Sequence, residues 1–296
     1  MSDHGYHSLD LDRLGTPRIL VLGDLMLDEY IWGSVSRISP EAPVPVIAGR
    51  MRELKAGGAG SVVENLAVLG ARVQVCGVIG DDEPGERFAE ILSRQGVSHR
   101  GLVRRAGRTT TQKIRVMASV QQAHRAQQQV CRVDFEDIQA PDESELRDIE
   151  RYLDEVFEEP PSVVLMSDYE KGLLSPEVIA SVVRRAKSCG VPVLVDPGRS
   201  VDYGRYRGAT LICPNRFESE QATDMELRGE EDYEVCARRL LESLELESVA
   251  LTLDREGIFL FKRDGSSQHF GTRARAVTDV AGAGDMVLSL LGLAVG

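Results

Sequence analysis

The chain has 296 residues, of which 42% are hydrophobic and 28% charged, and this composition excludes disorder as its main character. Its 35 Lys and Arg against 47 Asp and Glu give a formal net charge of -12, which argues against a nucleic-acid-binding or membrane-surface protein. A small anionic ligand remains compatible with this charge, because a few basic groups in a cleft act within a Debye length of roughly 8 Å.

The N-terminal residues and the cysteines favour a cytoplasmic protein. Residues 1–16 are polar and contain no apolar core of a signal peptide, and the chain has no run of 18 apolar residues. The five cysteines are odd in number and form no C-x-x-C pair, which is typical of reduced thiols. No repeat or linker interrupts the chain, so we expect one domain over residues 1–296.

Two regions near the N-terminus predict an accessory sheet. Arg18–Gly23 is a short apolar run that ends in Gly-Asp, as a buried strand delivering a loop does. Residues 30–54 and 102–134, by contrast, alternate in polarity or carry prolines, which central strands do not accept. We expect these two regions to contribute edge strands to a small β-sheet lid.

The rest of the chain repeats a strand, loop and helix unit. Strands are predicted at 73–79, 162–166, 191–195, 210–213, 249–252 and 257–262, and helices at 61–69, 83–95, 176–189, 232–244 and from 285. This alternation predicts an α/β fold with a mostly parallel central sheet covered by helices on both faces. Ligands of such sheets bind at the carboxyl ends of the strands.

A glycine-rich turn opens the helix at 61–69. Gly58-x-Gly60 superficially resembles a dinucleotide-binding fingerprint, but the charged residues 50–55 precede it where that motif needs a buried strand. The chain contains no G-x-x-x-x-G-K-[ST], so a Walker A site is excluded. The turn either approaches a ligand or is simply a flexible entry to the helix.

Asn215 and Glu218 follow the strand at 210–213, at the edge where a parallel sheet binds ligands. An amide and a carboxylate at this spacing either bond each other or hold the hydration shell of Mg²⁺. The five histidines are scattered, with no pair at helix spacing, which argues against structural zinc.

The segment Asp279–Asp285 carries the strongest chemical pattern. The small residues Gly282, Ala283 and Gly284 precede an apolar helix whose first N–H groups have no intrahelical partners, so this turn can bind an anion. A carboxylate at the rim of an anion site weakens phosphate binding by charge repulsion, so its presence there favours a catalytic role. Asp285 is suited to accept a proton from a hydroxyl that attacks the phosphate. The alternative is that Asp285 is a helix N-cap.

These segments together resemble the ribokinase-like (PfkB) carbohydrate kinases. Asp279–Asp285 resembles the C-terminal motif of the family, and Gly57–Asn65 the N-terminal one. Further segments resemble the D-glycero-β-D-manno-heptose 7-phosphate kinase branch, either alone or as the kinase half of a bifunctional kinase/adenylyltransferase: 23–28, 37–46, 132–136, 167–172 and 206–210.

The resemblance implies transfer of the ATP γ-phosphate to the anomeric hydroxyl of heptose 7-phosphate, in the pathway to ADP-heptose for lipopolysaccharide core. It implies that Asp285 is the base and that Gly282, Ala283 and Gly284 stabilise the transferring phosphoryl group. ATP and Mg²⁺ are the implied cofactors, and a homodimer formed through the accessory sheet is the implied assembly.

The same resemblance assigns the binding residues. The sugar would meet Asp28, Glu41, Gly57, Gly58, Ser61 and Asn65, and its 7-phosphate would meet Lys113, Arg115, Arg132 and Lys171. On the nucleotide side, Asn215 and Glu218 match the magnesium-positioning N-x-x-E, with Glu218 acting on Mg²⁺ through water, and Thr252 and Gly257 match the nucleotide loop.

The chain departs from the family pattern at several positions. Ser61 stands where a sugar-binding Asn is usual, Ala281 and Met286 replace threonines around Asp285, Gly198-Arg199 replaces Lys-Gly, and Ala126 interrupts a polar stretch. Each lost hydrogen bond costs on the order of 0.5–1.5 kcal/mol, enough to retune the substrate without abolishing catalysis. The chain ends about one helix after Asp285, so we expect a truncated C-terminal end.

The favoured hypothesis is therefore a heptose 7-phosphate kinase that binds no nucleic acid and no membrane. Two alternatives stay open: a related kinase for another sugar phosphate, favoured by Ser61 and Gly198, and a catalytically weak, dimeric sugar-phosphate-binding relative. A Rossmann dehydrogenase is less compatible, because the strand context of its glycine motif is missing.

Overall fold

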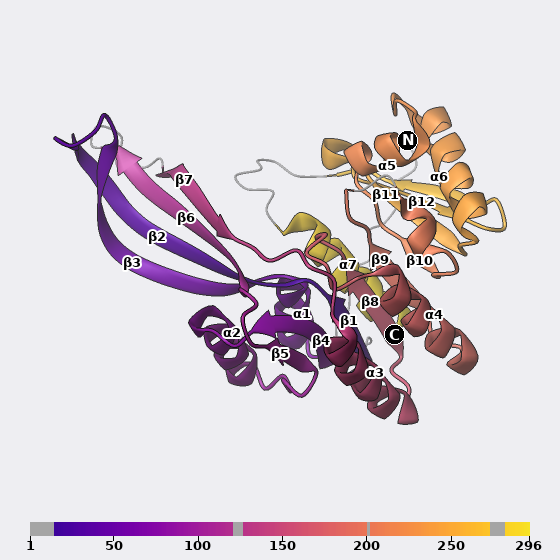
Figure 1. Ribbon diagram of the computed structural model, residues 1–296. Helices are drawn as coiled ribbons and strands as arrows, with labels where there is room; N and C mark the ends of the chain where they lie inside the picture. The colour runs from indigo at the N-terminus through magenta and orange to yellow at the C-terminus, as the bar shows by residue number, and fades with distance from the viewer. Residues whose placement is uncertain (1–14, 121–126, 200–201, 273–281) are drawn as a thin grey trace.

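A computed structural model describes residues 15–120, 127–199, 202–272 and 282–296 (Figure 1). Within these ranges the chain forms a nine-stranded sheet with helices on both faces, and a four-stranded sheet that projects away from it. This architecture confirms the predicted α/β fold with a lid. None of the helices in these ranges is long and apolar enough to cross a membrane.

The large sheet has the strand order β13-β12-β11-β10-β9-β8-β1-β4-β5. Its strands from β5 to β11 are parallel, and β12 and β13 add an antiparallel edge. The strands are β1 (Arg18–Gly23), β4 (Arg72–Gly80), β5 (Leu102–Arg105), β8 (Val163–Ser167), β9 (Val193–Asp196), β10 (Leu211–Ile212), β11 (Ser248–Thr252), β12 (Ile258–Lys262) and β13 (Ser267–Phe270).

Seven α-helices of the described ranges cover this sheet: α1 (Ala59–Val68), α2 (Glu83–Arg94), α3 (Glu143–Glu158), α4 (Pro176–Cys189), α5 (Arg216–Thr223), α6 (Glu230–Leu244) and α7 (Ala283–Val295). Local sequence fixes several helix ends. At α4, for example, the Ser175 hydroxyl accepts a hydrogen bond from the Val178 N–H, Pro176 is the first helical residue, and Gly190 ends the helix in a left-handed conformation.

Two hydrophobic cores lie on opposite faces of the large sheet. Because successive strand side chains point to opposite faces, Leu20 and Leu22 of β1 pack with α3, α4 and α6, whereas Ile19 and Val21 pack with α1, α2 and α7. All four side chains are fully buried. Burial on both faces explains why β1 is a continuous apolar run rather than an alternating one.

The lid has the strand order β3-β2-β6-β7, with β2 (Leu25–Ile38), β3 (Pro45–Gly58), β6 (Thr111–Val120) and β7 (Gln127–Phe135). β2 begins one residue after β1 ends, and β3 runs directly into α1. The base of the lid is therefore covalently continuous with β1 and α1, and its free end points away from the large sheet (Figure 1).

Three local expectations are wrong or incomplete. Leu102–Arg105 pairs with β4 in the large sheet and does not belong to the lid. β2 is an interior strand of the lid rather than an edge, because β6 covers its second side. The helices α3 and α5 and the strand β13 are not among the predicted elements. The first two differences arise because an alternating pattern specifies neither which sheet a strand joins nor whether the strand lies at the edge of that sheet.

Candidate active site

Three carboxylates follow neighbouring strands of the large sheet. Asp24 comes directly after β1, Asp168 directly after β8, and Asp196 is the last residue of β9. Since β9, β8 and β1 are adjacent and parallel, their carboxyl ends share one edge of the sheet. The α7 helix packs against β8, β9 and α1, and its third residue, Asp285, contacts Tyr169 just after β8, so the N-terminus of α7 lies at the same edge of the sheet.

Asp285 is the third residue of α7 and is only 4% exposed. Gly282 is the N-cap and makes no side-chain cap, so the alternative that Asp285 is the N-cap does not hold. The Tyr169 hydroxyl donates a hydrogen bond to Asp285 Oδ1 at 2.9 Å. Burial raises the pKa of Asp285, and hydrogen bonds from Tyr169 and Ser61 oppose that rise because they favour the carboxylate form.

The turn before Asp285 offers backbone donors to an anion. The first helical hydrogen bond of α7 runs from the Met286 N–H to the Gly282 carbonyl at 3.0 Å. The N–H groups of Ala283, Gly284 and Asp285 precede it and have no intrahelical acceptor. Gly282, Ala283 and Gly284 are exposed, so an anion can reach these donors.

The base of the lid presents a charged face. In the register of the lid, Lys113 of β6 lies between Asp28 of β2 and Asp134 of β7. Two residues farther along β6, Arg115 lies opposite Arg132 of β7. These side chains share one face, because residues paired across a sheet point the same way. The Arg115 guanidinium binds Asp28 Oδ1 at 2.7 Å.

The basic residues predicted for the 7-phosphate differ in their partners. Arg132 pairs with Asp134 at 2.9 Å, and Lys171 pairs with Glu136 at 3.0 Å. The Lys113 ammonium instead lies over the Tyr169 ring, 5.7 Å from its centroid, and burial lowers the pKa of Lys113. All of them lie at or near the base of the lid.

The N-terminal motif lies where the lid joins α1. Gly57 and Gly58 end β3, and Gly58 is the N-cap of α1. A Cβ atom on Gly282 would be 3.8 Å from both Ser61 Oγ and Asp285 Oδ2, so the residue that replaces the usual Asn lies near the predicted base. Asn65 is four residues later and shares that face of α1.

Glu41 is not brought to these residues. It lies in the turn between β2 and β3, at the end of the lid farthest from α7 (Figure 1). The strand from Asp28 to Ile38 alone spans about 33 Å at the usual rise per residue. Within one chain, Glu41 therefore does not close over the site.

Asn215 and Glu218 form a capping box at the start of α5. The Asn215 side chain accepts from the Glu218 N–H at 3.0 Å, and Glu218 Oε2 accepts from the Asn215 N–H at 2.8 Å. Thr252 forms a β-bridge with Asn215. Gly257 has φ +98°, and a side chain there would overlap the Phe270 carbonyl, so the turn into β12 itself requires this glycine.

Glu218 and Asp196 provide some, but not all, of the ligands that a hard cation such as Mg²⁺ needs. Burial raises the pKa of Glu218, and burial with the nearby charges of Glu218, Asp285 and Asp168 raises the pKa of Asp196 well above its usual value. Carboxylate oxygens are the ligands that Mg²⁺ prefers. Among the described residues, however, no three His, Cys, Asp or Glu side chains form a complete metal cage. A magnesium ion here would take its remaining ligands from water or phosphate.

Sequence reasoning missed Tyr169, Asp24 and Asp196. Asp196 ends a buried parallel strand, and Asp24 and Tyr169 follow such strands by one and two residues, which is the signal that could have identified them. Ala126 and Ala281, two of the noted departures, lie outside the described residues.

Comparison with known families and proteins identifies the family of this chain. Residues 16–294 match the model described as the pfkB family carbohydrate kinase. The chain is 47% identical over 283 residues to the bifunctional protein HldE of Geotalea uraniireducens, covering 94% of this chain and 56% of that protein. It is 44% identical to the HldE of Geobacter sulfurreducens, covering 95% of this chain and 56% of the relative. The chain thus spans just over half the length of these curated relatives.

Solved structures share the fold at low sequence identity. Arabidopsis thaliana ribokinase complexed with ribose and ATP superposes with a TM-score of 0.70 at 18% identity, covering 94% of this chain and 86% of the other. Escherichia coli phosphofructokinase-2 in complex with fructose-6-phosphate gives a TM-score of 0.72 at 19% identity, with coverages of 94% and 86%.

Proposed function

The chain belongs to the pfkB family of carbohydrate kinases, and we propose that it transfers the γ-phosphate of ATP to the anomeric hydroxyl of D-glycero-β-D-manno-heptose 7-phosphate. This step leads toward ADP-heptose and lipopolysaccharide core. The observation that carries the proposal is Asp285, a buried carboxylate at a helix N-terminus whose adjacent turn is exposed. The similarity to the HldE proteins and the branch-specific sequence segments support heptose 7-phosphate as the acceptor.

In the proposed reaction, Asp285 accepts the proton of the anomeric hydroxyl as that oxygen attacks the γ-phosphorus. The bond between this phosphorus and the bridging oxygen of ATP breaks, and ADP leaves with the electron pair. The N–H groups of Ala283, Gly284 and Asp285 stabilise the charge on the transferring phosphoryl group. The raised pKa of Asp285 suits a base, because it brings proton affinity closer to the working pH.

We assign the acceptor to the space between the lid and α1. Asp28, Gly57, Gly58, Ser61 and Asn65 line the sugar side. The 7-phosphate is assigned to the basic residues at the base of the lid, Lys113, Arg115, Arg132 and Lys171, which offer charge-assisted donors to a phosphate.

We assign ATP to the side of α5 and β11, with Asn215, Glu218, Thr252 and Gly257. Glu218 and Asp196 would hold a magnesium ion, with Glu218 acting through water. Such an ion neutralises phosphate charge and orients the phosphates. ATP is an abundant cytoplasmic metabolite, which supports the cytoplasmic location expected from the sequence.

We further propose a homodimer through the lid. Leu54, Val133 and Phe135 are 37%, 45% and 48% exposed. The register places Leu54, Glu29, Ile114 and Val133 in one row, on the opposite face of the lid from Asp28 and Lys113. Glu29 is buried there and pairs with Arg52, whereas the apolar side chains at the outer strands are exposed. These exposed apolar side chains are suited to contact a second copy of the chain. Glu41 can reach a sugar only in such a pair.

A kinase for another sugar phosphate is the second candidate. The observation that favours it is Ser61, which lies near Asp285 and replaces the residue type that usually contacts the sugar in this family. A changed contact between residue 61 and the sugar would alter which acceptor binds more than it would alter the phosphoryl-transfer step.

The acceptor assay separates these candidates. The purified chain is incubated with Mg·ATP and heptose 7-phosphate, with fructose 6-phosphate and ribose as control acceptors, and ADP release is measured. Heptose-dependent release is expected. Release with fructose 6-phosphate alone would support the second candidate, and a folded protein silent with all three would contradict a kinase and favour the sugar-phosphate-binding relative.

A further inference from the structure

Tyr169 is the side chain that joins the lid to Asp285. Its hydroxyl donates to Asp285 Oδ1 at 2.9 Å, and the Lys113 ammonium of β6 lies over its ring. Burial raises the pKa of the Tyr169 phenol, so the group remains protonated near neutral pH and can act only as a donor toward the carboxylate.

The loop that carries Tyr169 is built around a buried carboxylate. Asp24, only 3% exposed, accepts hydrogen bonds from the N–H groups of Tyr169 and Lys171 at 2.9 Å each and of Leu173 at 3.2 Å. Burying a charged group is costly, and three backbone donors offset that cost. The loop is thereby fixed to the end of β1.

The opposite side of the loop is fixed by Asp168. Its Oδ1 accepts from the Glu170 N–H at 2.8 Å, and its Oδ2 accepts from the Tyr206 hydroxyl at 2.7 Å. Glu170 has φ +58°, a left-handed conformation that is unfavourable for a residue other than glycine. Such strain persists only where the surroundings determine it, and it is concentrated at functional sites.

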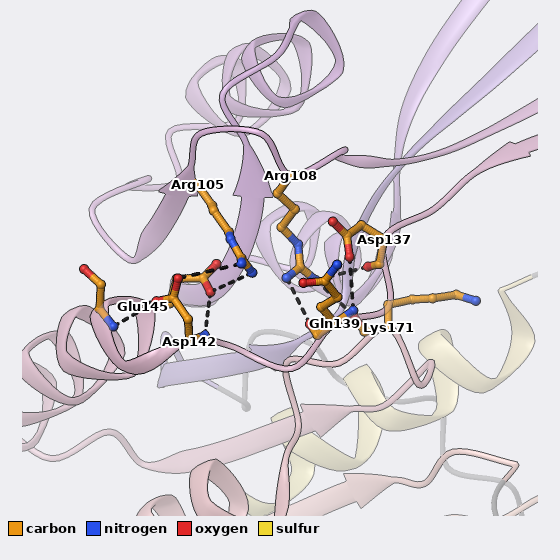
Figure 2. Close-up of polar contacts among 8 residues, drawn as sticks. Arg105, Arg108, Asp137, Gln139, Asp142, Glu145 and Lys171 are labelled. Carbon is orange, nitrogen blue, oxygen red and sulfur yellow. Dashed lines mark hydrogen bonds and ion pairs between the residues drawn. The ribbon is translucent and has the colours of Figure 1, made fainter.

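Arg108 connects the same loop to the lid. This buried guanidinium donates to the backbone carbonyls of Lys171 and Gln139 at 3.0 Å each and of Asp137 at 3.2 Å (Figure 2). Arg108 lies three residues before β6, the strand that carries Lys113. The lid base and the Tyr169 loop are therefore held in one framework.

From these contacts we propose that Tyr169 is a positioning residue for Asp285: its hydroxyl fixes the orientation of the carboxylate and favours its ionised form. The inference rests on the proposed role of Asp285 as base. A hydrogen bond to the ionised form lowers a carboxyl pKa, so its loss raises the pKa of Asp285. Less of the base is then ionised at a given pH, and the carboxylate is free to rotate away from the acceptor.

The test is Tyr169→Phe, which retains the ring under Lys113 and removes only the hydroxyl. We expect kcat to fall roughly ten- to hundred-fold with a smaller change in KM, as for the loss of a hydrogen bond to a charged group. The acid limb of the kcat/KM profile should move to higher pH by about one unit. Tyr152→Phe is the matched control, because this buried tyrosine lies on α3 against Gly101 and should leave both quantities unchanged.

A double-mutant cycle shows whether Tyr169 acts through Asp285. In an Asp285→Asn background, Tyr169→Phe should cause little further loss, whereas a general structural role would add its full effect. The position of the acid limb does not depend on the amount of active enzyme, so it is interpretable even if the variant is less stable.

The outcomes separate this inference from the proposed function. If Asp285→Asn is inactive while Tyr169→Phe keeps the wild-type kcat and acid limb, the positioning role is overturned and the kinase assignment stands. If Asp285→Asn turns over as wild type does, the base assignment itself fails. Two results together support the positioning role: the acid limb is shifted in Tyr169→Phe, and Tyr169→Phe causes little further loss of activity in the Asp285→Asn background.

Discussion

The backbone of Gly57 lies directly against the carboxylate of Asp28. A Cβ atom on Gly57 would be 2.7 Å from Asp28 Oδ2 and 2.8 Å from its Cγ. The other carboxylate oxygen binds Arg115 at 2.7 Å, so Asp28 is confined between a strand backbone and a guanidinium. Gly57, the first glycine of the N-terminal motif, therefore leaves the space in which the Asp28 carboxylate takes this orientation.

Gly57→Ala should weaken acceptor binding. The added methyl group must displace Asp28, because the two would be closer than real Cβ contacts allow. We expect KM for the sugar phosphate to rise about ten-fold, equivalent to about 1.4 kcal/mol, with a smaller change in kcat. Steady-state kinetics measure both. Gly49→Ala on the same strand is the control, since its Cβ would meet only Ile31 at 3.8 Å; equal KM values in the two variants would refute the proposed role of Asp28.

Glu218→Gln should change the magnesium requirement without unfolding α5. Glutamine can replace glutamate in a capping box, but it removes the negative charge that attracts the ion. We expect the variant to need roughly ten times more Mg²⁺ for half-maximal ADP release, which corresponds to a loss of about 1.4 kcal/mol of ion binding. EDTA should abolish ADP release by the wild type. Glu145→Gln, at the same position of the α3 capping box, should leave the magnesium titration unchanged. Identical titrations for all three proteins would remove Glu218 from the metal site.

Asp24 should impose a pH dependence on stability. Burial, together with the charge of Asp168, raises the pKa of Asp24 from 3.8 to about 6. The folded state then binds this proton more tightly than the unfolded state, so the free energy of unfolding decreases as pH rises from about 4 to about 6. The raised pKa corresponds to roughly 3 kcal/mol over that window.

Denaturant unfolding between pH 4 and 8 measures this effect. The free energy of unfolding of the wild type minus that of Asp24→Asn should decrease as pH rises through that window and should be constant above it. The variant lacks this pH dependence because asparagine does not titrate. Parallel stability curves for the two proteins would mean that Asp24 has an ordinary pKa.

Sequence reasoning identified those parts of the proposed site that are local in sequence. The turn at Gly282–Gly284, Asp285 and the Asn215–Glu218 pair were all identified from spacing, because a helix N-terminus and its first turn are encoded within a few residues. The alternation of strands and helices likewise predicted the large sheet, since each unit is continuous in sequence.

Other features depend on contacts between distant segments. Tyr169 and Asp285 are separated by 116 positions, and they meet only because β8 and α7 pack side by side. The pairing of β5 with β4 depends on the fold as a whole, and so does the interior position of β2 in the lid. No local pattern in Leu102–Arg105 distinguishes the two sheets.

Single-turnover phosphoryl transfer by Asp285→Asn tests the central claim most directly. The rate of heptose-dependent ADP formation is measured for the variant and the wild type, with nucleotide affinity measured on the same samples. If Asp285 is the base, the rate should fall roughly 10²- to 10⁴-fold while nucleotide affinity is retained. A variant rate close to that of the wild type, in a protein that still binds nucleotide, would contradict the assignment of Asp285 as the base.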